Sequence, residues 1–433
     1  MVVGESWGRL QRLEQRLCPV SSRFATSLPP YAPMIAYGNG RSYGDLCLND
    51  KGTLLLTRGM DRFIAFDPQS GIVECEAGVL LAEIIEAFLP HGWFPPVVPG
   101  TAFVTVGGAI ANDVHGKNHH RLGSFGNHVL EFELQRSDGR VLRCTPTENS
   151  EWFASTIGGL GLTGLIRRAR IQLRAVPGPW IHGFSRRFSN LREFIDFNDE
   201  SDSDFEYTVA WVDCSGAGRS MGRGVLSCGN HAPDQKPAAR KRPIRLPITA
   251  PISLVNSLSA RVFCEFYYRR SFAECPDATW HYRPFFFPLD GVLDWNRMYG
   301  PRGFFQYQCV IPRGDALRVL TEMLARIARS GQGSFLAVLK TFGSMPSLGL
   351  MSFPRPGVTL AVDFPNGGPK TLALMESLDE ITREVGGAVY PAKDARMSAA
   401  SFERYFPGLS EFRRYRDPQF SSSFWRRVTG SAA

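Results

Sequence analysis

The sequence predicts an α+β protein built from two domains. Its 433 residues, of which 43% are hydrophobic and 21% charged, supply enough apolar side chains for two hydrophobic cores. The residue pattern also changes near position 180. Short strands, glycine-rich turns and helices alternate over residues 1–179, whereas long aromatic-rich strands and amphipathic helices follow.

The first domain is predicted to contain two hairpins and a helix. Residues 64–78, IAFDPQSGIVECEAG, form two strand-like runs joined by a Pro/Gly turn. Residues 129–144 form a second hairpin with Asp138-Gly139 at its turn. The helix follows the first hairpin, and its apolar residues recur on one face: Leu81, Ile84, Ile85 and Phe88.

Strands and helices alternate in the second domain. Strands are predicted over residues 303–312, 333–343 and 357–365, and amphipathic helices over 315–330 and 371–385. Together they indicate helices packed around a sheet.

Polar side chains interrupt two of these otherwise apolar strands. Successive side chains of a strand point to opposite faces, so Gln306 and Gln308 share one face, and Lys340 shares a face with Leu336 and Val338. The pattern predicts a pocket over this sheet.

Composition excludes several classes of protein. No run of about 18 apolar residues is present, and the N-terminus lacks the apolar core of a signal peptide, which predicts a cytoplasmic protein. The nine cysteines are scattered without a C-x-x-C pair, which argues against a disulfide framework or a zinc ribbon.

The net charge of +8 is concentrated in one proline-rich segment. No acid occurs between Asp234 and Glu265. Six cations lie there: Lys236, Arg240, Lys241, Arg242, Arg245 and Arg261. Such a segment suits an anionic membrane surface or a lipid phosphate, and a solvated insertion without a partner is equally compatible with it. No nucleic-acid partner is expected, because no aromatic-interleaved basic sheet or recognition helix accompanies the charge.

Two glycine-rich stretches precede residue 170: YGNGRSYGD (37–45) and PGTAFVTVGGAIANDVHGKNHH (99–120). Glycine lets the backbone turn sharply and approach a ligand, so that free N–H groups can point at phosphate oxygens. A pyrophosphate is the guest that this arrangement favours, and structural tight turns are the alternative. Neither stretch has the spacing of a Rossmann loop or a P-loop.

The three histidines of HGKNHH (115–120) do not indicate a metal site. Gly116 disrupts a helical arrangement of the histidines, and no carboxylate or thiolate nearby completes a ligand set. His115 and Asn118 are better explained as hydrogen-bonding residues. Lys117, if buried, could hold a substrate phosphate or assist proton transfer.

Several motifs, in order along the chain, carry a family resemblance. They are GNGRSYGD (38–45), residues 99–120, GSFGNHV (123–129), STIGGLGLTGLI (155–166), residues 288–312, 335–343 and 352–365, and VYPAKDAR (389–396). The chain is identified as a member of the FAD-dependent decaprenylphosphoryl-β-D-ribose 2′-oxidases of the vanillyl-alcohol-oxidase-like flavoprotein superfamily. The resemblance implies a two-domain FAD-binding fold of the vanillyl-alcohol-oxidase, or PCMH, type. An antiparallel-sheet substrate domain would cover residues 180–387, and residues 388–433 would return to the FAD-binding domain.

The resemblance also implies roles for individual residues. Lys393 resembles the lysine required at the redox centre, with Tyr43 and Lys117 as further catalytic candidates. The implied FAD contacts are Gly38, Asn39, Gly40, Arg41, Ser42, Pro99, Gly100, Thr101, Gly107, Gly108, Asn112, His115, Gly116, Asn118, Ile166 and Tyr390. The implied substrate contacts are Trp211, Gln306, Gln308 and Lys340, and for each of these a plain structural role is the alternative.

Three departures from the family pattern matter. Related oxidases often tether FAD through a histidine in the first glycine loop, where this chain has Arg41, so FAD is expected to be non-covalent. Thr359 and Ala361 stand in TLAVDFP where mycobacterial members have N-I-C-V-D-F-P, so no thiol nucleophile is expected there. Phe286 stands where the family has a tyrosine, so the family's substrate contacts are not expected to carry over at this position, whereas the flavin chemistry is unaffected.

The implied reaction is oxidation of the ribose 2′-hydroxyl of a polyprenyl-phosphoryl sugar to a keto sugar, on the route to cell-wall arabinose. A separate NAD(P)H-dependent short-chain reductase would complete the epimerisation. The enzyme would lie in the cytoplasm, peripheral to the inner membrane. Two alternatives are a soluble aldonolactone or alditol oxidase and a non-catalytic flavin-fold binding subunit.

Overall fold

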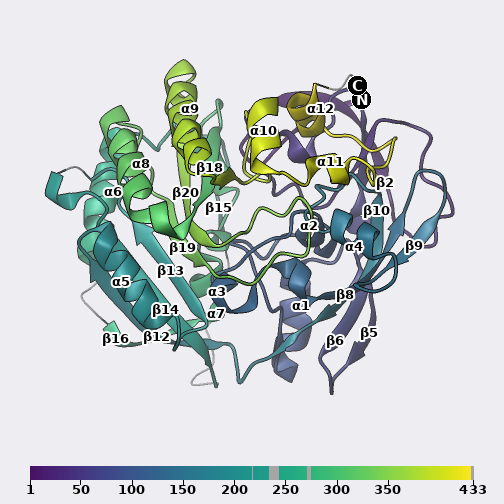
Figure 1. Ribbon diagram of the computed structural model, residues 1–433, viewed down its shortest axis with the longest axis horizontal. Helices are drawn as coiled ribbons and strands as arrows, with labels where there is room; N and C mark the ends of the chain where they lie inside the picture. The colour runs from purple at the N-terminus through teal and green to yellow at the C-terminus, as the bar shows by residue number, and fades with distance from the viewer. Residues whose placement is uncertain (217, 234–242, 271–274, 431–433) are drawn as a thin grey trace.

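The computed structural model describes residues 1–216, 218–233, 243–270 and 275–430. Two groups of sheets face each other across the molecule (Figure 1). Most strands of the first group come from the first 175 residues, and those of the second from residues 180–389. Helices combined with mostly antiparallel sheets in two groups agree with the predicted α+β fold class.

The N-terminal part contains three sheets and four helices. The four-stranded sheet has the order β1 (Val2–Glu5), β2 (Arg12–Pro19), β4 (Thr53–Leu56), β3 (Met34–Tyr37). The five-stranded sheet has the order β5 (Phe63–Asp67), β6 (Ile72–Glu76), β10 (Leu165–Gln172), β8 (Val129–Gln135), β9 (Val141–Cys144). A small sheet pairs β7 (Trp93–Phe94) with β11 (Arg174–Ala175). The helices are α1 (Leu81–Phe88), α2 (Val106–Ala111), α3 (His119–Leu122) and α4 (Ser150–Thr156).

The predicted elements of this part are confirmed. Strands β5 and β6 pair antiparallel, as do β8 and β9. Helix α1 buries the four apolar residues predicted to share one face. They pack into a core together with β6, β8 and β10, because an amphipathic helix is stabilised by burying its apolar stripe.

The second group is dominated by one eight-stranded sheet. Its order is β16 (Cys275–His281), β12 (Trp180–Phe188), β14 (Gly224–Ala232), β13 (Tyr207–Val212), β19 (Ala337–Phe342), β20 (Gly357–Pro365), β18 (Phe304–Ile311), β21 (Ala388–Val389). All its pairings are antiparallel. A short parallel pair joins β15 (Ile244–Arg245) to β17 (Val292–Leu293).

One face of the large sheet is covered by helices. Helices α5 (Leu191–Ser201), α8 (Ala316–Ser330) and α9 (Pro369–Glu384) share a hydrophobic core with alternate residues of β13, β14, β18, β19 and β20. Figure 1 shows these helices on the side away from the N-terminal sheets. The other residues of the same strands therefore face the N-terminal part. Helices α6 (Ser257–Arg270) and α7 (Tyr282–Phe286) lie at the periphery of this sheet.

In the second domain, two predicted boundaries differ from the observed ones by two or more residues, and the others differ by at most one residue. Helix α9 begins before the predicted residue 371, because Pro369 occupies its first turn, where no backbone N–H is needed. Strand β19 begins later than residue 333, because the Ser334 hydroxyl accepts a hydrogen bond from the Leu336 N–H and bends the chain.

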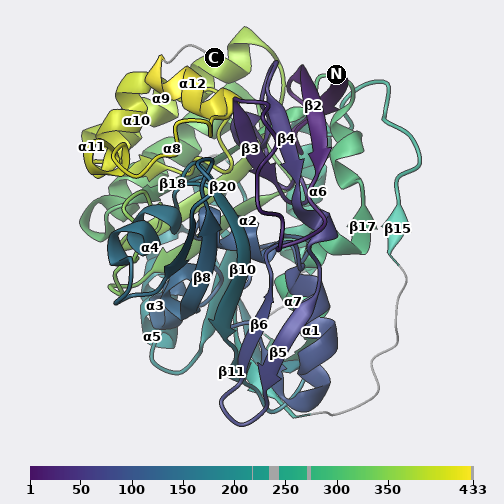
Figure 2. The same ribbon diagram turned by 90° about the vertical axis from the view of Figure 1, so that its right-hand side faces the viewer.

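The C-terminal segment returns to the N-terminal strands. After β21 the chain forms α10 (Ala399–Tyr405), α11 (Leu409–Phe412) and α12 (Ser423–Thr429). Phe420 bridges to Met34 of β3, and Arg427 pairs with Asp45 at 2.7 Å. Figure 2 shows α12 beside β3. Residues from both ends of the chain thus close the same side of the molecule.

Part of the predicted basic segment lies outside the described residues: Lys236, Arg240, Lys241 and Arg242. Arg245 and Arg261 are described. Within the described ranges, no helix has both the length and the apolar character needed to cross a bilayer.

Candidate active site

A cavity of about 820 Å³ lies between the glycine-rich loops and the uncovered face of the large sheet. That volume is within the range of ligand-binding sites. Alternate residues of five strands line the sheet side: Val209, Trp211, Val225, Ser227, Gln306, Gln308, Val338, Lys340, Ala361 and Asp363. The strand register explains this set, since Gln306 lies opposite Asp363 and Gln308 opposite Ala361.

The glycine loops form the opposite wall. Gly40 has φ +60°, and a Cβ on it would lie 2.1 Å from the Tyr37 hydroxyl, so only glycine fits. A Cβ on Gly38 would lie 2.4 Å from Thr105 Oγ1. Gly100 has no atom within 4 Å of its Cβ position. The two loops therefore pack closely against the protein while leaving their cavity side open to a ligand.

Three polar side chains at this wall have a buried atom without a hydrogen-bond partner. These atoms are Arg41 Nε, Asn112 Oδ1 and His115 Nδ1. An unpaired buried polar atom costs free energy, so each is expected to bind a ligand. Two donors and one acceptor beside the glycine loops fit the FAD implied by the sequence resemblance. The diphosphate of FAD accepts hydrogen bonds, and its ring system both donates and accepts them. Tyr390, whose hydroxyl donates to the Asn112 carbonyl at 3.0 Å, closes this wall.

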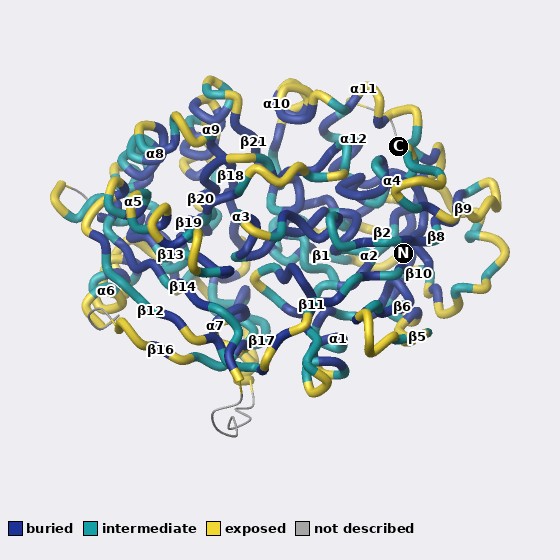
Figure 3. Tube along the Cα trace, turned by 60° about the horizontal axis from the view of Figure 1, so that its bottom comes forward, coloured by how far each residue is buried: buried dark blue, intermediate teal, exposed yellow. Residues whose placement is uncertain are grey.

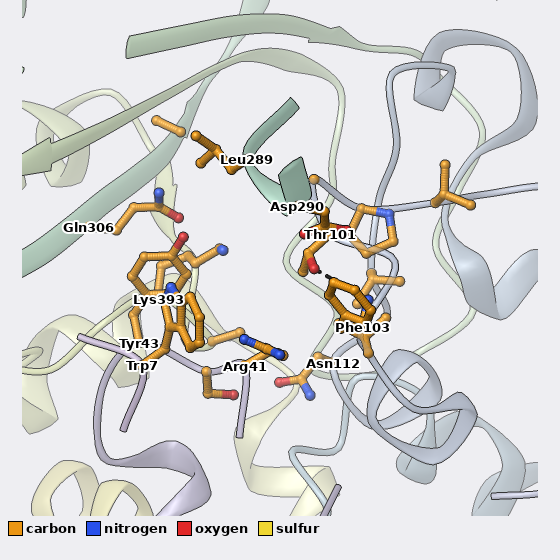
Figure 4. Close-up of a pocket in the computed structure, with 18 of the residues that line it drawn as sticks. Trp7, Arg41, Tyr43, Thr101, Phe103, Asn112, Leu289, Asp290, Gln306 and Lys393 are labelled. Carbon is orange, nitrogen blue, oxygen red and sulfur yellow. Dashed lines mark hydrogen bonds between the residues drawn. The ribbon is translucent and has the colours of Figure 1, made fainter. Parts of the chain in front are cut away.

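A charged cluster lies on one side of the cavity (Figure 4). The Lys393 ammonium lies 4.0 Å from the centroid of the Tyr43 ring. Asp363 is fully buried and accepts a hydrogen bond from Gln306 Nε2 at 2.6 Å. Tyr299 donates to its other oxygen at 3.4 Å. Residues from the first glycine loop, the large sheet and the C-terminal segment thus meet here.

Burial and charge set the protonation of this cluster. Burial lowers the pKa of Lys393 to about 7, while nearby Asp363 acts to raise it. Burial raises the pKa of Asp363 to about 7, and the hydrogen bond from Gln306 opposes that shift. The pKa of Tyr43 is raised well above its usual value, first by burial and then by Asp363. Each of Lys393 and Asp363 therefore stabilises the charged form of the other. Tyr43 remains a neutral phenol.

Two further lysines face the cavity. The Lys117 ammonium donates to the Phe285 carbonyl and lies 4.6 Å from the centroid of the Phe285 ring. Burial, and then the charge of Lys340, lowers the pKa of Lys117 to about 7. Burial lowers the pKa of Lys340 to about 8. Lys117 is therefore positioned to lose or gain a proton near neutral pH.

His115 is held as a neutral imidazole. Burial, and then the charge of Lys340, keeps its pKa well below the usual value. Gln308 Nε2 lies 2.8 Å from His115 Nε2 and also donates to Thr359 Oγ1 at 3.1 Å. An amide N–H can only donate, so His115 Nε2 accepts and its proton resides on the unpaired Nδ1. That N–H is available to a ligand.

The structure brings nearly all the predicted site residues to one cavity. All three catalytic candidates, all four substrate candidates and all but one of the predicted FAD contacts line it. Asn118 does not. Its amide donates to the Pro96 carbonyl at 2.8 Å and to Glu206 at 3.3 Å, so it anchors the loop from behind. The expectation that Asn118 contacts the cofactor has no support in the structure.

Sequence reasoning missed three acidic residues that line the cavity, Asp290, Asp294 and Asp363. Asp363 is a polar residue in the otherwise apolar strand 357–365, as Gln306 is in strand 303–312. That interruption could have identified Asp363 as a residue of the pocket. Asp290 lines the opposite wall and accepts from the Ala102 N–H at 2.8 Å. Burial raises the pKa of Asp290, and hydrogen bonds from Thr101 and Ala102 oppose that shift. Phe286 is buried and lines the cavity without a hydroxyl.

The remaining histidines of the HGKNHH motif turn away from the cavity. His119 packs against Phe342 with ring centroids 4.4 Å apart. His120 Nε2 lies 3.0 Å from the Phe205 carbonyl. Among the residues that the structure describes, no group of three or more His, Cys, Asp or Glu side chains could hold a metal ion.

Comparisons with known proteins agree with this geometry. Residues 30–145 match the FAD binding domain family. The chain is 38% identical over 415 residues to decaprenylphosphoryl-β-D-ribose oxidase of Mycolicibacterium smegmatis, covering 91% of this chain and 89% of that protein. It is 34% identical over 373 residues to an uncharacterized protein in the mprA 5′ region of Streptomyces coelicolor, covering 81% of this chain and 100% of that protein. Cytokinin dehydrogenase 8 of Oryza sativa subsp. indica is 30% identical over 180 residues, 39% of this chain and 34% of that protein. The chain belongs to the decaprenylphosphoryl-β-D-ribose oxidase family of FAD-dependent oxidoreductases.

Proposed function

We propose that the protein oxidises the 2′-hydroxyl of a polyprenyl-phosphoryl-β-D-ribose to the 2′-keto sugar, the first half of an epimerisation to the arabinose form. The observation that carries this proposal is the cluster of Lys393, Tyr43 and Asp363 in a cavity between glycine loops and a polar sheet face. A relative that matches 91% of this chain is named decaprenylphosphoryl-β-D-ribose oxidase.

Bound FAD would supply the hydride acceptor. Residues of the first glycine loop, the second loop up to Gly116 and Tyr390 would hold it, with residues 1–179 and 388–433 as the FAD-binding part. Lys393 would stabilise negative charge that develops on the reduced cofactor. Lys117, with a pKa lowered to about 7, could take the proton of the substrate hydroxyl at neutral pH.

The sheet side of the cavity would bind the sugar. Gln308 is held by His115 and Thr359, so its amide is fixed in orientation. Lys340 and Trp211 line the same face and can contact the phosphate and the ribose ring. A fixed donor set is what orients a hydroxyl-bearing carbon for hydride transfer.

The two alternative functions are less well supported. A soluble aldonolactone or alditol oxidase would need no cationic group for a phosphate, whereas Lys340 and Arg245 both line this cavity. A non-catalytic binding subunit would not need a buried lysine beside a tyrosine and a carboxylate.

Anaerobic titration tests the function. The purified yellow protein should bleach when a polyprenyl-phosphoryl ribose is added, because the sugar would reduce the flavin. The arabinose epimer or a simple alditol should not bleach it. Bleaching by alditols alone would contradict the proposal.

The partners follow from the chemistry of the product. A 2′-keto sugar needs a reductant, so a separate NAD(P)H-dependent short-chain reductase would complete the epimerisation. Because the lipid-linked substrate resides in a bilayer, we place the protein at an anionic membrane surface, peripheral to the inner membrane.

We expect FAD to be non-covalent. Residue 41 is an arginine whose guanidinium lies 4.3 Å from the centroid of the Trp7 ring, and no histidine occupies the first glycine loop to form a tether. Acid precipitation should release the yellow colour into the supernatant. Flavin that stays in the pellet would contradict this expectation.

We expect the basic segment to contribute to membrane binding. Replacing Lys236, Arg240, Lys241, Arg242 and Arg245 with glutamine should weaken sedimentation with anionic vesicles, since each cation contributes about 1 kcal/mol near such a surface. The variant should still turn over a short, water-soluble analogue. Unchanged vesicle binding at low salt, where screening is weakest, would leave the segment without this role.

A further inference from the structure

Helix α6 exposes an apolar stripe to solvent. Ala260 and Cys264 are its buried residues. Leu258, Val262 and Phe266, spaced four residues apart and therefore on one face, are 71%, 63% and 56% exposed. Figure 3 shows how much of this helix is exposed. A contiguous exposed apolar face of this kind marks a binding surface.

The stripe continues into the cavity. Phe263 and Tyr267 neighbour it on the helix and line the cavity, yet they remain 36% and 40% exposed. Tyr267 packs against Trp211 with ring centroids 4.6 Å apart, and Phe263 against Phe335 at 4.9 Å. These two residues therefore stand at a mouth of the cavity, where its wall passes into the outer surface.

Other elements at this mouth combine apolar and cationic groups. Val292 and Leu293 of β17 line the cavity and are only partly buried. Arg245 of the neighbouring β15 lines it too, and its guanidinium lies 3.5 Å from the Asp294 carboxylate. A cation between an enclosed polar cavity and an apolar surface suits a phosphate with a hydrocarbon chain attached.

We infer that the stripe of Leu258, Val262 and Phe266 is the subsite for the hydrocarbon chain of the substrate. The chain leaves the cavity past Phe263 and Tyr267 and lies along α6. This assignment rests on the proposed function for the sugar and phosphate. The stripe is continuous with the substrate cavity. This continuity favours the hydrocarbon chain of the substrate as its occupant over a bilayer or a second copy of this protein.

Chain-length dependence tests the assignment. The variant Leu258→Ser/Val262→Ser/Phe266→Ser should raise KM for decaprenyl-phosphoryl ribose about tenfold or more, because three apolar contacts are lost. Its KM for the geranyl analogue and its kcat for both should stay unchanged. The assay is run in detergent, with no bilayer present. Leu372→Ser on α9, where Leu372 is 41% exposed, is the matched control and should behave as wild type.

Three results would overturn the assignment. The first is an equal KM change for both chain lengths. The second is a change seen only with vesicles, which would make the stripe a bilayer contact. The third is a lower molecular mass of the variant in sedimentation equilibrium, which would make it a contact between copies.

A binding measurement separates this inference from the proposed function. Decaprenyl phosphate, which carries no sugar, should quench tryptophan fluorescence of the wild type and much less that of the triple variant. Inorganic phosphate should not distinguish the two. If decaprenyl phosphate quenches the wild type more than the triple variant but no ribose derivative bleaches the flavin, the proposed function is wrong and the subsite assignment holds. Equal quenching of both proteins would overturn the subsite.

Discussion

Replacing Lys393 with methionine should leave FAD bound and slow substrate-dependent flavin reduction by about 10²- to 10³-fold. That factor is typical of losing one preorganised group that stabilises developing charge. Methionine matches the apolar stem of lysine and lacks the ammonium group. Asp363 would lose its opposite charge, and its pKa, already raised to about 7, would rise further until it is neutral. Stopped-flow flavin bleaching measures the rate.

Lys370→Met provides the control for this variant. Lys370 is an exposed lysine in the first turn of α9, so its replacement should change neither FAD content nor the reduction rate. A near-normal rate in Lys393→Met would show that Lys393 is structural. Loss of FAD from the variant would show that Lys393 holds the cofactor instead of assisting the reaction.

Replacing Asp363 with asparagine should shift the pH dependence of flavin reduction to lower pH. Asp363 raises the pKa of Lys393 while burial lowers it, so without the carboxylate the pKa of Lys393 falls below about 7. Lys393 would then be neutral at pH 7 and become charged only as the pH drops. We expect flavin reduction at pH 7 to slow about fivefold or more, since a fall of one unit from a pKa of about 7 lowers the charged fraction of Lys393 at pH 7 from about one half to about one eleventh. Part of the rate should return in acid.

Asp379→Asn is the matched control. Asp379 is also buried, and burial raises its pKa to about 6, but it pairs with Arg396 at 2.7 Å outside the cavity. This variant should lower thermal stability and leave the pH profile unchanged. If Asp363→Asn only lowers the melting temperature, Asp363 does not position the charge of Lys393.

The sequence by itself determined most local structure. Turn residues and apolar alternation predicted the hairpins at 64–78 and 129–144, and the apolar spacing of residues 81–88 predicted α1. These elements form because their hydrogen bonds and buried faces depend on nearby residues. The motif resemblance also identified the family, and all but one of the site residues that it implied line the cavity.

Only the tertiary structure decided how the site is assembled. Tyr43 precedes the other two residues of the cluster by more than 300 positions. Asp363 lies in β20 and Lys393 lies after β21, so no local pattern places the three together. Asn118 sits inside the same glycine-rich motif as the cavity residues, yet its loop turns it toward Pro96. The pKa values near 7 likewise arise only when burial removes water from charged groups and brings them close. Local periodicity fixes which side of an element is buried, but packing between elements fixes which side chains share a cavity.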